Sequence, residues 1–248
     1  MSKDLTGLLN EWPHDPEQTM RIIVADDGRS VLQVRLPLGI EQYELTGRPD
    51  GARPFDKETV LEELDDRLQR YRTEHGTDEG FTLSHEDCIL LQSEGVLYYY
   101  RYLLLFQLND FERVVADTDH NLLTCTMLEK YCENDEDKNA VLQYKPYILR
   151  MNAMARAMES IHEHLKETAQ KILISAISEI ESMEELESPA FQFERIRSLN
   201  YLRSALKQID ERPATDPRQM LETELTKAIE DEDYEKAAEI RDKIRELS

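Results

Sequence analysis

The chain has 248 residues and a formal net charge of −22, and it contains 3 cysteines. This length fits one or two domains and is enough to bury a sizeable core. The excess of carboxylates argues against direct nucleic-acid binding, because such binders gain much of their affinity from Lys and Arg that neutralise phosphates. No apolar run reaches about 18 residues, so we expect no transmembrane helix.

The N-terminus and the cysteines indicate the compartment of the protein. The start Met-Ser-Lys-Asp lacks a basic patch followed by an apolar stretch, so we expect no signal peptide. Cys88, Cys125 and Cys132 are an odd number and lack the spacing of a disulfide framework. Together these features predict a reduced, cytoplasmic setting.

The first region, residues 1–53, predicts a small antiparallel β-sheet over 20–46, preceded by a short helix that ends before Pro13. Asp27-Gly28 is a tight-turn signal between the first two strands. In the second strand, Leu32 and its even-numbered neighbours through Leu38 alternate with Gln33 and Arg35, which predicts one buried face. The predicted strands are Met20–Ala25, Val31–Leu38 and Glu41–Leu45.

Residues 54–210 predict a helical bundle. Asp56 is the expected cap of a helix that ends near Gly76, and Ser84 with Asp87 approximates a capping box. The helix after Ser84 is apolar nearly all round, which indicates the central core helix. Asn109-Asp110 is the turn to a third helix that ends near Cys132.

The second half of the predicted bundle leaves one boundary open. Glu133–Lys138 reads as a solvated loop, and Lys145-Pro146 starts the next helix. That helix either runs unbroken to Leu186 or turns near His164. A last helix over Phe191–Ile209 has apolar residues at core spacing. These residues are Phe193, Ile196, Leu199, Leu202, Leu206 and Ile209.

The stretch Tyr98–Leu122 weakly resembles a tetratricopeptide unit, with its turn at Leu108–Glu112. Tyr102 and Asn121 stand where small residues are expected, and no repeat of about 34 residues follows. The sequence therefore favours a bundle of antiparallel helix pairs. The predicted fold is mostly α with a small N-terminal antiparallel β-sheet (α+β), a helical bundle, and a linker with a C-terminal helical hairpin in residues 211–248.

The C-terminal stretch contains two short helical patterns. Asp216-Pro217 opens the first, and the acidic run Asp231–Asp233 separates it from the second. So small a unit, below roughly 40 residues, must dock on the rest of the chain or on another molecule. The apolar faces comprise Leu221, Leu225, Ala228 and Ile229, then Tyr234, Ala237, Ile240, Ile244 and Leu247, with Ala238 beside them.

The run from Glu232 to Leu247, EDYEKAAEIRDKIREL, resembles the UVR motif, also called the UvrB/UvrC motif. In that family the motif is a helical hairpin that pairs with another such hairpin or docks on a partner. It occurs in the excision-repair proteins UvrB and UvrC, in Clp-type unfoldases and in an activator of a protein arginine kinase. The resemblance implies contact with a protein and leaves the identity of that protein open.

Motifs that would add chemistry to this hairpin are missing. No G-x-x-x-x-G-K-[ST] occurs, so the ATP-binding P-loop is absent, and no C-x-x-C pair occurs for a zinc ribbon. Glu159-x-x-His162 lacks the second copy that a di-metal site needs, so it reads as a solvated helix face. Cys125 and Cys132 lie two turns apart and are typical of core thiols.

Two further groups carry weaker alternatives. The aromatic run Tyr98–Tyr102 can stack on bases, but in so acidic a chain it indicates core packing with one exposed tyrosine. Arg35, Arg48 and Arg53 lie on or near a glycine-rich loop with Asp50, where they could form a small anion or peptide site. Turn chemistry is the simpler interpretation of that loop.

The predicted function is a non-enzymatic adaptor or regulator that docks on a protein partner, another UVR motif or a second copy of itself. The alternatives are an accessory protein of nucleotide excision repair and an enzyme with a site near Arg35, Arg48 and Arg53. We expect no cofactor, no metal, no direct nucleic-acid contact and no membrane contact. The predicted partner-binding residues are Leu225, Ala228, Ile229, Tyr234, Ala237, Ala238, Arg241, Ile244 and Leu247.

Overall fold

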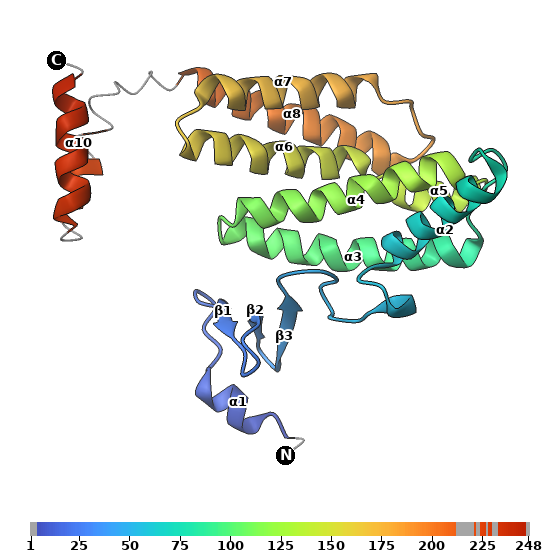
Figure 1. Cartoon of the computed structure of the whole chain (residues 1–248), viewed down its shortest axis with the longest axis horizontal. Helices are drawn as coiled ribbons and strands as arrows, with labels where there is room; N and C mark the ends of the chain where they lie inside the picture. The colour runs from blue at the N-terminus through green and yellow to red at the C-terminus, as the bar shows by residue number, and fades with distance from the viewer. Residues whose placement is uncertain (1–3, 212–220, 222–223, 227, 230–232, 247–248) are drawn as a thin grey trace. The chain divides into compact units, whose positions relative to one another are not determined.

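The computed structural model describes residues 4–211, 221, 224–226, 228–229 and 233–246. The chain divides into two compact units, Met1–Arg203 and Ser204–Ser248. The described residues are mostly helical, with a small three-stranded antiparallel sheet near the N-terminus, which confirms the predicted fold class (Figure 1). None of the described helices is long and apolar enough to cross a membrane.

The sheet follows a short helix, α1 (Thr6–Glu11), and its strand order is β1-β2-β3. Gly28 allows the tight turn between the first two strands, because its φ of 87° lies in the left-handed region. In the antiparallel register Ile22 faces Leu32, and Gln33 faces Gln42. The strands are β1 (Met20–Val24), β2 (Ser30–Leu36) and β3 (Gly39–Glu44).

The prediction of a single buried sheet face is wrong. Val31 and Leu32 point to opposite faces of β2 and both are fully buried. The segment after α1 contacts the second face: Arg35 Nε donates to the Trp12 carbonyl oxygen at 2.6 Å, and Arg21 stacks over the Trp12 ring at 4.0 Å. Leu38, predicted to lie on the buried face, is 92% exposed in the turn after β2.

Eight further helices are described in the order of the chain, and a 3-10 turn, η1 (Pro54–Asp56), precedes them. They are α2 (Val60–His75), α3 (His85–Gln107), α4 (Phe111–Tyr131), α5 (Asp135–Leu142), α6 (Lys145–His162), α7 (Lys166–Ser182), α8 (Pro189–Glu211) and α10 (Tyr234–Glu246).

The helix boundaries confirm some predicted caps and correct others. Ser84 and Asp87 form the predicted capping box of α3, and Gly76 ends α2 with a φ of 75°. The cap of α2 is Thr59 rather than the predicted Asp56, because the Thr59 side chain accepts the Glu62 N–H at 3.0 Å. Asp56 lies in η1 instead.

The predicted loop over Glu133–Lys138 is largely helical. Asn134 Oδ1 accepts the Asp137 N–H at 3.0 Å, and three acidic residues occupy the first turn of α5. Carboxylates at this end of a helix are favoured by its dipole, so an acidic run that suggests a loop also suits a helix start. Of the two alternatives for the helix that starts at Lys145-Pro146, the structure shows the turn near His164. This residue has a φ of 62° and lies between α6 and α7.

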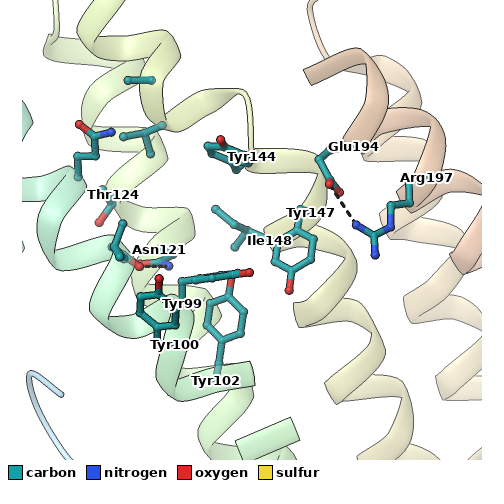
Figure 2. Close-up of a pocket in the computed structure, with 15 residues that line it drawn as sticks. Tyr99, Tyr100, Tyr102, Asn121, Thr124, Tyr144, Tyr147, Ile148, Glu194 and Arg197 are labelled. Atoms are coloured by element: carbon teal, nitrogen blue, oxygen red, sulfur yellow. Dashed lines mark hydrogen bonds and ion pairs between the residues drawn. The ribbon is translucent and has the colours of Figure 1, made fainter. Parts of the chain in front are cut away.

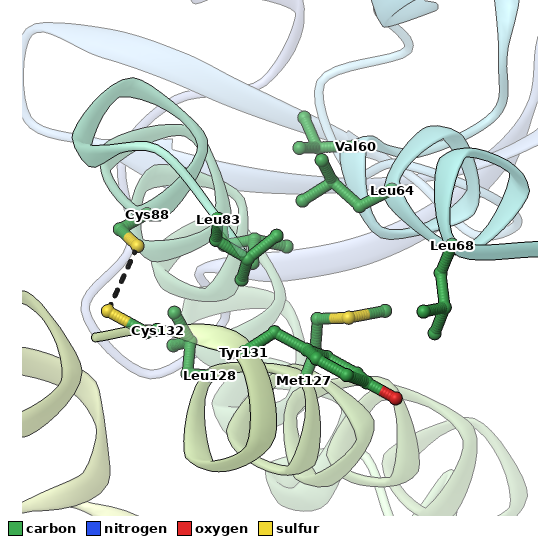
Figure 3. Packing of buried hydrophobic residues seen from close by; sticks show 10 residues of the cluster. Val60, Leu64, Leu68, Leu83, Cys88, Met127, Leu128, Tyr131 and Cys132 are labelled. Atoms are coloured by element: carbon green, nitrogen blue, oxygen red, sulfur yellow. Dashed lines mark hydrogen bonds between the residues drawn. The ribbon is translucent and has the colours of Figure 1, made fainter. Parts of the chain in front are cut away.

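Within Met1–Arg203, α3, α4, α6 and α7 pack in sequence order as antiparallel neighbours (Figure 1). One core cluster joins the sheet to the bundle, with Leu32 from β2, Tyr102 from α3 and Met151 from α6. A second cluster joins α2 to the start of α3 and the end of α4 (Figure 3). The sheet and the bundle therefore share a core.

The apolar spacing predicted for α8 is wrong in part. Phe193 and Ile196 are each 62% exposed. The buried positions are Phe191, Ser198 and Leu202, which follow each other at helical spacing of seven and four residues. Leu202 is therefore a correctly predicted core position, whereas Phe193 and Ile196 lie on the exposed side of α8.

Candidate functional site

The C-terminal hairpin is held together by a small apolar contact and a capped turn. Asp233 Oδ1 accepts the Lys236 N–H at 3.1 Å at the start of α10, and the Asp233 N–H donates to the Ala228 carbonyl oxygen at 2.8 Å. Ala228, Ala237 and Ile240 are buried, with Leu221, Leu225 and Ile244 half-buried around them. Two alanines at the contact let the helices approach closely.

The predicted partner-binding residues divide into two groups. Ala228 and Ala237 are buried within the hairpin, with Leu225 and Ile244 at its edge. Ile229 is 52% exposed, and Ala238 and Arg241 are also exposed. The Arg241 guanidinium lies 3.7 Å from its neighbour Asp242. Tyr234 is the first residue of α10, but its side chain and Leu247 lie outside the described residues.

The arginines of the alternative site have structural contacts. Arg35 is buried and donates to the carbonyl oxygens of Trp12, Leu36 and Gly39. Arg48 lies 2.9 Å from Asp50 and 3.2 Å from Glu94. Arg53 is exposed. Arg35 and Arg48 therefore already have hydrogen-bond or ion-pair partners within the fold.

Glu94 is the centre of a buried polar network that the sequence interpretation missed. Its side chain is 0% exposed and accepts the N–H groups of Val60 and Leu61, at 2.7 Å and 3.1 Å, at the start of α2. His120 Nε2 lies 3.2 Å from Oε1. Burial works to raise the pKa of Glu94, but the His120 ring and the two N–H groups outweigh it and hold the pKa below its usual value.

A second buried pair lies two turns further along α3. Arg101 meets Asp117 of α4 through two bonds, of 2.9 Å and 2.5 Å. The same guanidinium donates to the carbonyl oxygens of Glu44 and Gly47. Charged residues inside an apolar helix are the sequence signal for such contacts, because a buried charge must be paired. The network fixes the loop after β3 to α3 and α4.

An aromatic groove of about 370 Å³ lies between α3, α4, α5, α6 and α8 (Figure 2). Tyr99 and Tyr100 are both exposed here, so the aromatic run of α3 has two exposed tyrosines rather than the predicted one. Asn121 and Thr124 are buried and line the groove, and Asn121 Oδ1 and Thr124 Oγ1 have no hydrogen-bond partner among the described residues. The groove can therefore accept an aromatic or apolar group that carries a donor.

The fold brings Cys88 and Cys132 together and places Cys125 in a different core cluster. Cys125 is buried with Leu142 and Ile148. Cys132 instead lies beside Cys88, and burial, aided by that neighbour, raises the pKa of Cys88 to about 12. The motif Glu159-x-x-His162 gains no further ligand among the described residues, and the His162 ring lies 5.5 Å from that of Phe111.

The C-terminal hairpin is also the part of the chain that is similar to a known family. Residues 220–248 match the family described as the UvrB/uvrC motif (UVR), which confirms the resemblance of the C-terminal hairpin. UVR motifs generally mediate contacts between proteins. No curated protein and no solved structure matches the chain.

Proposed function

We propose that this protein is a non-enzymatic adaptor or regulator that docks on a protein partner through its C-terminal hairpin. The observation that carries the proposal is the UVR match in a hairpin that belongs to a compact unit separate from Met1–Arg203. Among the described hairpin residues, the buried ones in its core are Ala228, Ala237 and Ile240, so the burial that stabilises it is small. A partner that covers its exposed apolar side chains would stabilise it.

The division of the hairpin residues suggests which of them meet the partner. Ala228, Ala237 and Ile240 are already used to join the two helices. Ile229 is a large apolar side chain on the outside, and Ala238 and Arg241 are exposed on α10. We place Ile229, Ala238 and Arg241 at the docking surface, with an acidic group of the partner facing Arg241.

A role in excision repair is the second candidate, and it rests on the same UVR match. The net charge of −22 favours a protein contact over a DNA contact in that role. An enzymatic role near Arg35, Arg48 and Arg53 has less support, because Arg35 and Arg48 are already engaged with backbone oxygens and carboxylates.

The test compares three charge-introducing variants of the full chain in pull-downs from source-cell lysate and in analytical ultracentrifugation. Ile229→Glu should abolish capture or self-association while α10 stays folded. Ala237→Glu should do so by separating the two helices. Lys236→Glu, an exposed position on α10, is the matched control and should bind like the unaltered chain.

Binding of the same partner by a chain that ends at Glu211 would overturn the proposal, because that chain lacks the hairpin. If Ile229→Glu binds fully and Ala237→Glu does not bind, the docking surface lies on the hairpin but does not include Ile229. Mass spectrometry of the captured material separates a repair complex from other partners.

A further inference from the structure

Three elements of the bundle bring two thiols and a carboxylate together. Cys88 is on the second turn of α3, Cys132 directly follows α4, and Asp137 is in the first turn of α5. The two sulfur atoms are 3.4 Å apart, and one ligand atom from each of the three residues lies within 4.8 Å of the others. Figure 3 shows the two cysteines facing each other.

We propose that Cys88, Cys132 and Asp137 bind one Zn²⁺ ion. Zinc in proteins takes thiolate and carboxylate ligands, most often in tetrahedral geometry. Two thiolates at about 2.3 Å from a tetrahedral ion are about 3.8 Å apart, so the sulfurs need to separate by about 0.4 Å. Binding replaces the proton of each thiol, and two protons leave to solvent.

His85 is a positioning residue for this site. Its Nδ1 atom lies 2.7 Å and 2.9 Å from the two carboxylate oxygens of Asp137. Cys88 is three positions further along α3, so the two side chains lie on the same face of this helix. Ligating carboxylates are commonly held by such an outer partner, which fixes their orientation. Water completes the coordination, because the His85 side of the site faces solvent.

The starts of α3 and α5 favour anionic ligands at two of the three positions, whereas Cys132 follows the C-terminal end of α4. Cys88 lies near the start of α3 and Asp137 near the start of α5, where backbone N–H groups and the helix dipole attract negative charge. The ion would join the beginning of α3 to the end of α4 and the beginning of α5. Its effect is therefore to hold together three elements that share a core with α2.

A disulfide is the alternative for the same two thiols. It requires the sulfur atoms to approach from 3.4 Å to about 2.05 Å and an oxidant that accepts two electrons and two protons. A disulfide makes no use of Asp137 or His85, whereas a metal uses both. The four-residue arrangement therefore favours the ion.

The experiment titrates the reduced full chain with Zn²⁺ and counts bound ions by native mass spectrometry. Co²⁺ is a second probe, because thiolate ligands give it an intense near-ultraviolet absorption band. The variants are Cys88→Ser, Cys132→Ser, Asp137→Asn and His85→Ala. Cys125→Ser is the matched control, because this buried cysteine on α4 belongs to no such ligand group among the described residues. Circular dichroism checks that each variant is folded.

We expect one Zn²⁺ per chain and a thiolate band with Co²⁺. Both should be lost in the Cys88 and Cys132 variants and kept in Cys125→Ser, while His85→Ala should weaken binding by about 10- to 100-fold. Failure of the reduced chain to bind either ion would overturn the proposal. Binding that survives in folded Cys88→Ser or Cys132→Ser would also overturn it, as would a Cys88–Cys132 disulfide in chain that was purified with zinc present.

Discussion

Glu94→Ala should destabilise the Met1–Arg203 unit by about 3–5 kcal/mol, the range for leaving a buried charged network without one partner. The change removes the acceptor of the Val60 and Leu61 N–H groups, and each buried donor left unpaired costs about 1–3 kcal/mol. It also leaves Arg48 and His120 without their shared carboxylate. Most of the loss should come from the start of α2, which Glu94 fixes to α3.

Urea unfolding followed by far-ultraviolet circular dichroism measures this loss. Glu94→Gln keeps one acceptor oxygen and should lose about half as much, since a hydrogen bond to a charged group contributes about 1.5–3 kcal/mol. Glu86→Ala, an exposed glutamate on the same helix, is the control and should cost at most about 1 kcal/mol. A loss below about 1 kcal/mol for Glu94→Ala would refute the reasoning.

The same network predicts a pH dependence. The pKa of Glu94 is lower in the folded chain than its usual value of 4.5. The unfolded state therefore binds the proton first as the pH falls. The stabilisation by the carboxylate is fully present above the unfolded pKa and is lost as the pH falls through the folded pKa. The gap in stability between the unaltered chain and Glu94→Gln should narrow in that acidic window and stay constant above it.

Three further outcomes follow from the two units and the charge. A chain that ends at Glu211 should still unfold cooperatively in a thermal melt. Loss of cooperative unfolding would show that the hairpin belongs to the core. Ala237→Glu should cost the hairpin several kcal/mol through a buried carboxylate, and Lys236→Glu under about 1 kcal/mol, measured as α10 helicity. Fluorescence anisotropy should show no tight binding of duplex DNA at physiological salt; sub-micromolar affinity that falls steeply with salt would contradict this.

Local signals were sufficient where a structure depends on a few neighbouring residues. The capping box at Ser84, the stop at Gly76 and the turn at Gly28 depend on side chains and backbone conformations within four residues. The UVR hairpin was also predicted, because its residues recur at fixed spacing within one short segment. These features were correct from the sequence.

The spacing of apolar residues was a less reliable guide to the buried face where other segments cover two faces of an element. Gln33 and Arg35 were assigned to a solvated face of β2, but the segment around Trp12 contacts that face. The apolar spacing of α8 correctly placed Leu202 in the core, but Phe193 and Ile196 are exposed and Phe191 is buried instead. Sequence patterns within one element do not predict which distant segment of the chain packs against it.

By itself, the sequence determined the fold class and the UVR hairpin, because each depends on composition or on closely spaced residues. Only the tertiary structure decided which polar groups meet. Glu94 and Arg48 are 46 residues apart, and Cys88 and Cys132 are 44 apart. Their pairing follows from how α3 and α4 pack against the loop after β3 and against each other, and residue spacing within one helix cannot encode it.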